Sequence, residues 1–167
     1  MSVLTDGPTQ TDAQSQPTVS ERVLIVEDDA AARVGLVQLV KSWGFLAESA
    51  SDGEDALVKV TSFRPSIVIS DLVMPRMDGL ALLRTLQSQD ADVTTLLLTA
   101  MGTVETAVEA MKEGAYDYLT KPVDIQRLKV LLDKIVERQE TLREVKEIGR
   151  AHVSTPVTVA SRMPSSA

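Results

Sequence analysis

The sequence predicts an α/β fold in which a parallel sheet of five strands is covered by helices on both faces. Short apolar runs alternate five times with segments of helical period after residue 22. The runs at 67–69 and 96–98 contain no polar residue. A strand without polar alternation is typical of a sheet covered on both sides, as parallel sheets are. Five βα units in a doubly wound arrangement follow.

The elements are expected in regular order along the chain, with strands and helices alternating from the first to the last. Apolar runs predict strands at 22–26, 46–50, 67–70, 94–98 and 116–119, and helical periodicity predicts helices at about 30–43, 53–61, 79–88, 104–113 and from about 124 onward. Gly44 is placed to end the first helix. The pairs Asp52-Gly53 and Asp78-Gly79 supply turn and N-cap residues before the second and third helices.

Composition excludes several classes of function. The 167 residues carry a net charge of -7, so this chain is not expected to bind nucleic acid directly or to adhere to an anionic membrane. No apolar run approaches the roughly 20 residues of a bilayer span, and no Lys or Arg precedes Arg22 to begin a secretory signal, which predicts a cytoplasmic protein. Without cysteine, and with His152 as the only histidine, a thiol or histidine metal site is not expected.

The two ends of the chain differ from its middle. Residues 1–20 are rich in Ser, Thr and Gln and predict a disordered leader. The helical pattern continues over 138–147 as a linker, either a short coiled coil that would support a homodimer or a solvated helix extension. Residues 148–167 lack helical period and are expected to be disordered. They resemble a translated sequencing adapter fused to a truncated gene, and the alternative is a natural Ser/Pro/Thr tail.

Acidic residues gather where buried strands end. Glu27, Asp28 and Asp29 follow the first strand, and Asp71 follows the third. In a parallel sheet these ends meet at one edge, where ligands bind. Two carboxylates about 4 Å apart repel by roughly 4 kcal/mol at an effective dielectric of 20, so the cluster calls for a cation. Lys121, after the fifth strand, would not balance the set alone, and oxygen-only ligands predict Mg²⁺.

A metal beside an aspartate, with a hydroxyl and an ammonium facing it, is suited to phosphoryl transfer onto carboxylate oxygen. Asp71 is the candidate acceptor, and Thr99 and Lys121 lie at the ends of the fourth and fifth strands. The alternative for each acid is a solvated cap or turn residue.

Four motifs carry a resemblance to a known family. VEDD, SDLVMPRMDG, LLLTA and YDYLTKPVD occur in order, and together they resemble the receiver domain of two-component response regulators over about residues 21–137. The resemblance implies a flavodoxin-like (βα)5 fold with strand order 2-1-3-4-5. It also implies a signalling protein, not an enzyme, that takes a phosphoryl group from a sensor histidine kinase or phosphotransfer protein. Small-molecule phosphodonors are a further source.

The resemblance assigns roles to the acidic residues. Asp71 becomes the phosphoacceptor and a metal ligand, Asp28 a direct Mg²⁺ ligand, and Glu27 a ligand acting through water. The backbone carbonyl of Val73 would be a further ligand. Asp29 falls outside the family's acidic pair and is expected to be a neighbour of the metal site.

It also implies a switch. Thr99 would hydrogen-bond the phosphoryl group, and Lys121 would pair with it, followed by Pro122 in a cis peptide bond. Tyr118 takes the place of the switch aromatic, whose ring turns inward as Thr99 moves toward the phosphoryl group. A plain half-buried strand aromatic is the alternative for Tyr118. The expected result is a remodelled surface and, on phosphorylation, a homodimer.

Two other functions stay open at this point. The linker resembles those that join receivers to an ATPase and a DNA-binding module in activators of the nitrogen-regulator class, so control of transcription would need an output domain missing from this chain. One alternative is a pseudo-receiver that binds proteins without taking phosphate. The other is an FMN-binding flavodoxin, which the acidic strand ends and the missing phosphate loop disfavour.

Overall fold

The computed structural model describes residues 21–89, 91–100 and 103–161, with side chains described as far as residue 145. The expected leader at 1–20 and the end of the expected tail at 162–167 lie outside these residues. Within them, strands and helices alternate in chain order: β1 Arg22–Val26, α1 Ala30–Ser42, β2 Leu46–Ala50, α2 Gly53–Phe63, β3 Ile67–Asp71, α3 Gly79–Ser88, β4 Thr94–Thr99, α4 Val104–Lys112, β5 Asp117–Thr120 and α5 Ile125–Ser161.

All strand pairs are parallel, and the sheet has the order β2-β1-β3-β4-β5. Both the parallel sheet and the strand order implied by the resemblance are thus confirmed. Central β1 and β3 lie side by side, with Val26 opposite Ser70, and Asp71 of β3 lies opposite Leu98 of β4. The carboxyl ends of the strands therefore share one edge of the sheet.

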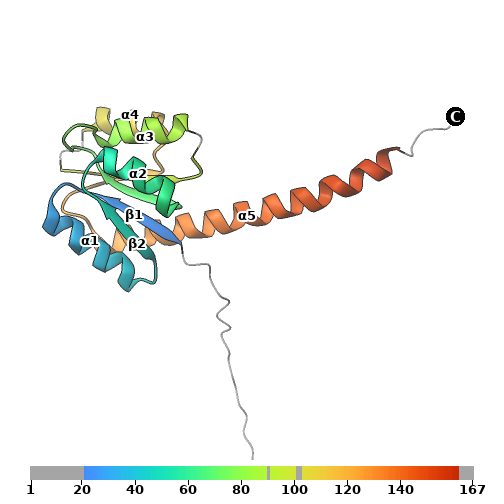
Figure 1. Ribbon diagram of the computed structural model, residues 1–167, viewed down its shortest axis with the longest axis horizontal. Helices are drawn as coiled ribbons and strands as arrows, with labels where there is room; N and C mark the ends of the chain where they lie inside the picture. The colour runs from blue at the N-terminus through green and yellow to red at the C-terminus, as the bar shows by residue number, and fades with distance from the viewer. Residues whose placement is uncertain (1–20, 90, 101–102, 162–167) are drawn as a thin grey trace, which may run out of the picture.

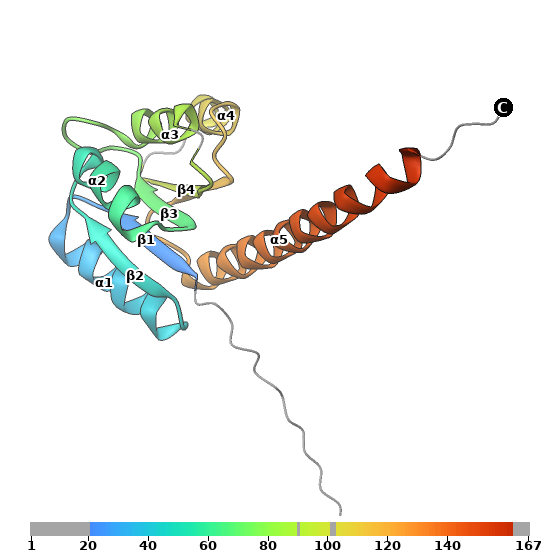
Figure 2. The ribbon, with the colours of Figure 1, turned by 45° about the vertical axis from the view of Figure 1, so that its right-hand side comes forward.

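Helices cover both faces of the sheet, with α1 and α5 on one face and α2, α3 and α4 on the other (Figures 1 and 2). Successive residues of β1 enter different cores: Val23 and Ile25 pack toward α1 and α5, whereas Leu24 and Val26 pack toward α2 and α3. Each fully buried side chain of this kind stabilises the fold by about 1.5–3 kcal/mol. Burial on both faces explains why β1, β3 and β4 show no polar alternation, whereas β2 at the edge of the sheet does alternate between exposed and less exposed residues.

Capping residues set the helix starts as the sequence predicts. The side chain of Asp52 accepts a hydrogen bond from the backbone N–H of Asp55 at 2.8 Å, and that of Asp78 accepts from Ala81 at 2.8 Å. Gly44 follows the end of α1 with φ of 95°, the left-handed region that glycine enters without strain. These caps place the loops after the strands at the acidic edge.

Helix α5 is longer than the sequence pattern predicts. The pattern predicts helix as far as residue 147 and disorder from 148, whereas α5 runs from Ile125 to Ser161. Neither Gly149 nor Pro156 ends the helix, although both residue types disfavour helix interiors. The division at residues 137 and 147, and the origin of 148–167, stay predictions. None of the helices in the described ranges combines the length and apolar character needed to cross a membrane.

Candidate functional site

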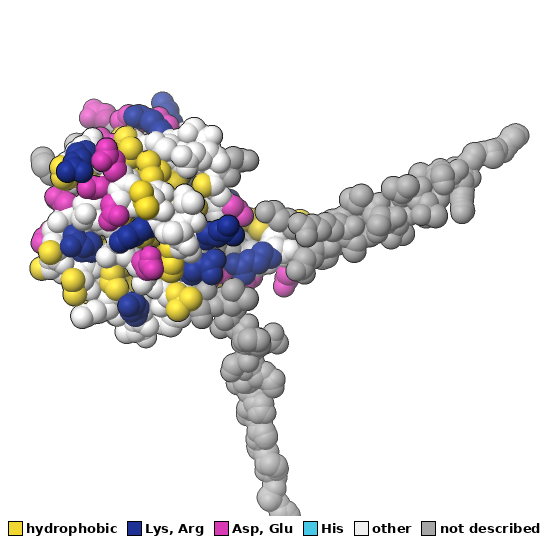
Figure 3. Space-filling model, viewed as in Figure 1, with side chains coloured by type: hydrophobic (Ala, Val, Ile, Leu, Met, Phe, Trp, Pro, Cys, Tyr) yellow, Lys and Arg dark blue, Asp and Glu magenta, His cyan; other side chains and the backbone are white. Residues whose placement is uncertain are grey.

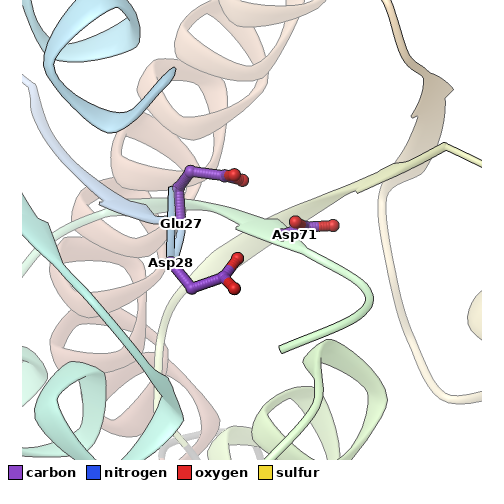
Figure 4. A group of neighbouring side chains, drawn as sticks. All are labelled: Glu27, Asp28 and Asp71. Carbon is purple, nitrogen blue, oxygen red and sulfur yellow. The ribbon is translucent and has the colours of Figure 1, made fainter. Parts of the chain in front are cut away.

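The acidic residues of β1 and β3 meet at the carboxyl edge of the sheet. Glu27 and Asp28 follow β1, Asp71 ends β3, and one carboxylate oxygen of each lies within 4.8 Å of the others. Figure 4 shows the carboxylates of Glu27 and Asp28 pointing toward the side on which Asp71 lies. Glu27 and Asp71 are 2% and 7% exposed, while Asp28 is exposed. Two carboxylates are thus held away from bulk water beside a third that is open to it.

Lys121 joins two of these acids. Its Nζ donates hydrogen bonds to Glu27 Oε2 at 3.0 Å and to Asp71 Oδ2 at 2.9 Å. The lysine follows β5, so it reaches both acids across the sheet edge. The three carboxylates, when ionised, and one ammonium leave two negative charges uncompensated. A divalent cation held by oxygen would neutralise them, so the donor set fits Mg²⁺.

The environment of the site shifts the pKa values of Glu27 and Lys121. Burial is the largest influence on Glu27 and raises its pKa above the ordinary 4.5, a rise that the charge of Asp71 adds to and the hydrogen bond from Lys121 opposes. Burial lowers the pKa of Lys121, but the hydrogen bonds and charges of Asp71 and Glu27 outweigh it and raise that pKa above 10.5. Lys121 is therefore an ammonium at neutral pH.

The loop after β3 is folded back onto Asp71. The backbone N–H of Val73 donates to Asp71 Oδ1 at 3.3 Å, and Gly79 packs so closely that a Cβ there would lie 2.5 Å from the carbonyl oxygen of Asp71. Only glycine fits that contact. The side chain of Val73 is 72% exposed. The role of its carbonyl as a metal ligand stays a prediction.

Thr99 and Tyr118 lie on adjacent strands around a small cavity. Thr99 ends β4 and is 2% exposed, and the half-buried Tyr118 lies on β5 opposite Leu97. Both line the cavity, together with Leu72, Leu97, Thr106, Ala107 and Ala110. The Lys121–Pro122 peptide bond is cis, as the resemblance implies. The two switch candidates therefore share one hollow beneath α4.

Asp29 serves a structural purpose. Its side chain caps α1 by accepting a hydrogen bond from the backbone N–H of Ala31 at 3.2 Å, and it is not among the three clustered acids. A neighbour that the sequence reasoning left without a role is Arg33. Its Nη1 donates to the carbonyl oxygen of Glu27 at 2.8 Å and to that of Asp28 at 3.4 Å. The signal for it was an arginine in the first turn of the helix, five residues after Asp28.

An apolar hollow adjoins the acidic edge. It has a volume of about 530 Å³ and lies between α1 and the start of α5. Leu36 and Leu39 of α1 line it, together with Pro122 and Val123, and Glu27 and Lys121 lie at its margin. A partner seated there would be close to the carboxylates.

Comparison with known proteins identifies what this arrangement is similar to. The sequence model described as the response regulator receiver domain matches residues 23–133. The regulatory protein AtoC of Escherichia coli (strain K12) is 34% identical over 134 residues, which is 80% of this chain and 29% of AtoC. The transcriptional regulatory protein ZraR of Salmonella typhimurium is 38% identical over 130 residues, 77% of this chain and 30% of ZraR. The chain thus spans less than a third of either relative.

Solved structures agree with the fold. A response regulator receiver protein from Pseudomonas putida superposes with a TM-score of 0.66 at 34% identity, covering 70% of this chain and 98% of that one. The receiver domain of the Francisella response regulator 1452 has a TM-score of 0.69 at 28% identity, covering 72% and 99%. These matches leave the flavodoxin alternative without support.

Proposed function

We propose, for a chain that belongs to the family of response regulator receiver domains, that it takes a phosphoryl group onto Asp71 from a histidine kinase or phosphotransfer protein. The observation that carries this is the contact set around one carboxylate: Asp71 bonded to Lys121 at 2.9 Å and clustered with Glu27 and Asp28. Nothing else among the described side chains combines an acceptor oxygen, a cation and spare metal ligands. The domain acts as a signalling module and not as a typical enzyme.

The transfer needs a nucleophile and a place for negative charge. An oxygen of the Asp71 carboxylate forms the new O–P bond while the P–N bond of a phosphohistidine breaks, and the departing nitrogen keeps the bonding electron pair. Lys121 faces the charge that develops on the phosphoryl oxygens, and Thr99 offers a hydroxyl from the neighbouring strand. Glu27 and Asp28 would hold Mg²⁺, with the carbonyl of Val73, and bound Mg²⁺ would supply further charge neutralisation.

The apolar hollow beside the acids suits the docking of the phosphodonor protein. Its apolar lining would bury a helix face of the partner, and Lys121 at its margin lies within the cluster. A phosphohistidine carried by that partner would then reach Asp71.

The output is a change of surface. Movement of Thr99 toward the phosphoryl group would open space for Tyr118 in the cavity that both line, and this would repack α4 and β5. Relatives that carry the words transcriptional regulatory protein in their names are over three times as long as the matched segment. We therefore propose that the chain works in the cytoplasm, as a homodimer when phosphorylated, in the control of transcription through an output domain outside this sequence.

Intact-protein mass spectrometry after incubation with acetyl phosphate tests the proposal. We expect one phosphoryl group per wild-type chain with Mg²⁺, none with EDTA, and none in Asp71→Asn. A folded wild-type chain that binds Mg²⁺ but stays unmodified would favour the pseudo-receiver alternative, in which the same surface binds proteins without taking phosphate.

A further inference from the structure

A second polar cluster joins helix α5 to the edge of the sheet opposite the acidic site. Arg143 Nη2 donates to Glu21 Oε1 at 2.6 Å, and the hydroxyl of Ser66 donates to Glu21 Oε2 at 2.5 Å. Gln139 Nε2 donates to the carbonyl of Ser66 at 2.9 Å and to Thr94 Oγ1 at 3.1 Å. We call these five residues the helix latch. They connect α5 to the amino-terminal ends of β1, β3 and β4.

The latch contains a buried charge. The side chain of Glu21 is 6% exposed and that of Arg143 is 49% exposed, so the carboxylate is the member that water reaches least. A carboxylate held in this way is costly to leave unpaired. Lys and Arg side chains gather on the face next to the point where α5 leaves the domain (Figure 3).

Three of the five latch residues lie outside the range that matches the receiver family. The family match covers residues 23–133, whereas Glu21 precedes it and Gln139 and Arg143 follow it. Gln139 and Arg143 also lie beyond residue 137, where the sequence predicts that the domain ends. The latch thus joins residues on both sides of the matched range to Ser66 and Thr94 within it.

The latch contacts hold one face of α5 where the helix leaves the domain. Gln139 and Arg143 are four residues apart and so occupy one face of the helix. A helix that leaves a domain without tertiary contacts frays, because helical hydrogen bonds alone stabilise a short segment only marginally. Here one face of the first turns beyond residue 137 is bonded to the sheet, while Leu142 and Val145 stay exposed at 48% and 58%.

We propose that the helix latch makes residues 138–143 a rigid part of the domain and fixes the direction in which α5 leaves it. The helix then turns with the sheet as one body, and a module attached to it is carried at a set angle. This function does not depend on phosphorylation of Asp71.

Hydrogen exchange of the full 167-residue chain tests the latch, with Arg143→Met and Gln139→Met as the variants. We expect amides 140–145 to exchange roughly 10-fold faster or more in both variants than in wild type, while amides 128–135 keep their rates. Lys134→Met, which removes an exposed cation from the same helix, is the matched control and should behave as wild type.

Equal exchange at 140–145 in the wild type and both variants would overturn the proposal, as would wild-type amides there exchanging at the rate of an unstructured chain. Arg143→Met leaves Glu21 unpaired and could also speed the exchange of strand amides. In that case Gln139→Met, which keeps the ion pair between Arg143 and Glu21, decides whether the latch protects amides 140–145. We expect amides 140–145 of Asp71→Asn to exchange at wild-type rates. The outcome of the phosphorylation experiment therefore does not affect the test of the latch.

Discussion

Lys121 holds Glu27 and Asp71 through one ammonium group, with Nζ 3.0 Å from Glu27 Oε2 and 2.9 Å from Asp71 Oδ2. Both carboxylates are nearly inaccessible to water, and they come from different strands of the sheet. The lysine is therefore part of the electrostatic balance of the folded domain before any phosphoryl group is present.

Removing that ammonium should destabilise the metal-free domain. We expect Lys121→Ala to lower the free energy of unfolding in EDTA by about 1–3 kcal/mol, less than for a fully buried pair because Lys121 is 28% exposed. Mg²⁺ should restore part of the loss, since it would supply the missing positive charge. Urea unfolding with and without Mg²⁺ measures both effects. Lys112→Ala, an exposed lysine of α4, is the control, and equal stability of the two variants in EDTA would contradict the prediction.

Asp71→Asn should abolish phosphorylation and preserve the fold. Lys121 keeps its bond to Glu27 in this variant, and loss of one of two repelling carboxylates offsets the lost ion pair. We expect the free energy of unfolding to change by less than about 1 kcal/mol. Thermal unfolding and intact mass after acetyl phosphate treatment are the measurements. Asp133→Asn, an exposed acid of α5, should keep full phosphorylation, and a large loss of stability in Asp71→Asn would count against this account.

The sheet can be predicted from the sequence more completely than the two ends of the chain. The limits of β1 match the predicted range to the residue, because burial on both faces leaves an apolar run with sharp ends. The clustering of Glu27 with Asp71 followed from topology, since parallel strand ends must meet at one edge. Which atoms Lys121 contacts was not predictable, because it depends on side-chain placement across loops.

The extent of α5 and the helix latch could not be predicted from the sequence, for a different reason. Helical period reports an apolar face, whereas Gln139 and Arg143 attach α5 through polar atoms whose partners Ser66 and Glu21 are 73 and 122 residues away. No local pattern encodes contacts of that separation. Arg33 differs from these residues, since its partners are only five and six positions away but are backbone carbonyls that any residue would offer.

Glu27 should give the metal-free domain a pH-dependent stability. Its pKa is raised above 4.5, chiefly by burial, so the folded state binds the proton more tightly than the unfolded state. The resulting stabilisation is fully present below about pH 4.5 and is lost as pH rises through the raised folded-state pKa. Lys121 affects stability in a different pH range. Because its pKa is raised, the stability that its ammonium contributes is lost only above pH 10.5.

Urea unfolding in EDTA at a series of pH values isolates this effect when wild type is compared with Glu27→Gln. As pH rises above 4.5, we expect the unfolding free energy of wild type to fall relative to that of Glu27→Gln. A difference that is constant between pH 4 and 8 would show that Glu27 titrates as it does in the unfolded chain.

Asp28 and Asp29 should differ in their effect on Mg²⁺. Asp28 belongs to the clustered acids, whereas Asp29 caps α1. We expect Asp28→Asn to weaken Mg²⁺ binding by roughly 10-fold or more, as loss of a ligand from a site with few protein ligands would. Asp29→Asn should change it by less and should keep the cap, because asparagine caps helices equally well. Calorimetric titration of the two variants compares them, and the reverse order would reassign the ligand.

The switch role of Tyr118 has a clean spectroscopic test, because the chain contains two tyrosines and Tyr116 serves as an internal control. Tyr118 lines the cavity beside Thr99, whereas the ring of Tyr116 lies under Arg138, with the guanidinium carbon 5.8 Å from the ring centre. With fluorotyrosine labelling, we expect beryllofluoride and Mg²⁺ to shift the resonance of Tyr118 and leave that of Tyr116 in place. Tyr116→Phe assigns the two signals.

Two variants decide whether that shift is a switch. Asp71→Asn should abolish it, because beryllofluoride has no acceptor to occupy. Thr99→Ala should keep beryllofluoride binding but reduce the shift of Tyr118. The variant lacks the hydroxyl whose movement toward the bound group makes space for the Tyr118 ring. If Tyr118 shifts fully in Thr99→Ala, the tyrosine responds to the acidic site by another route. If it does not shift in wild type that has bound beryllofluoride, the ring is a packing residue of β5.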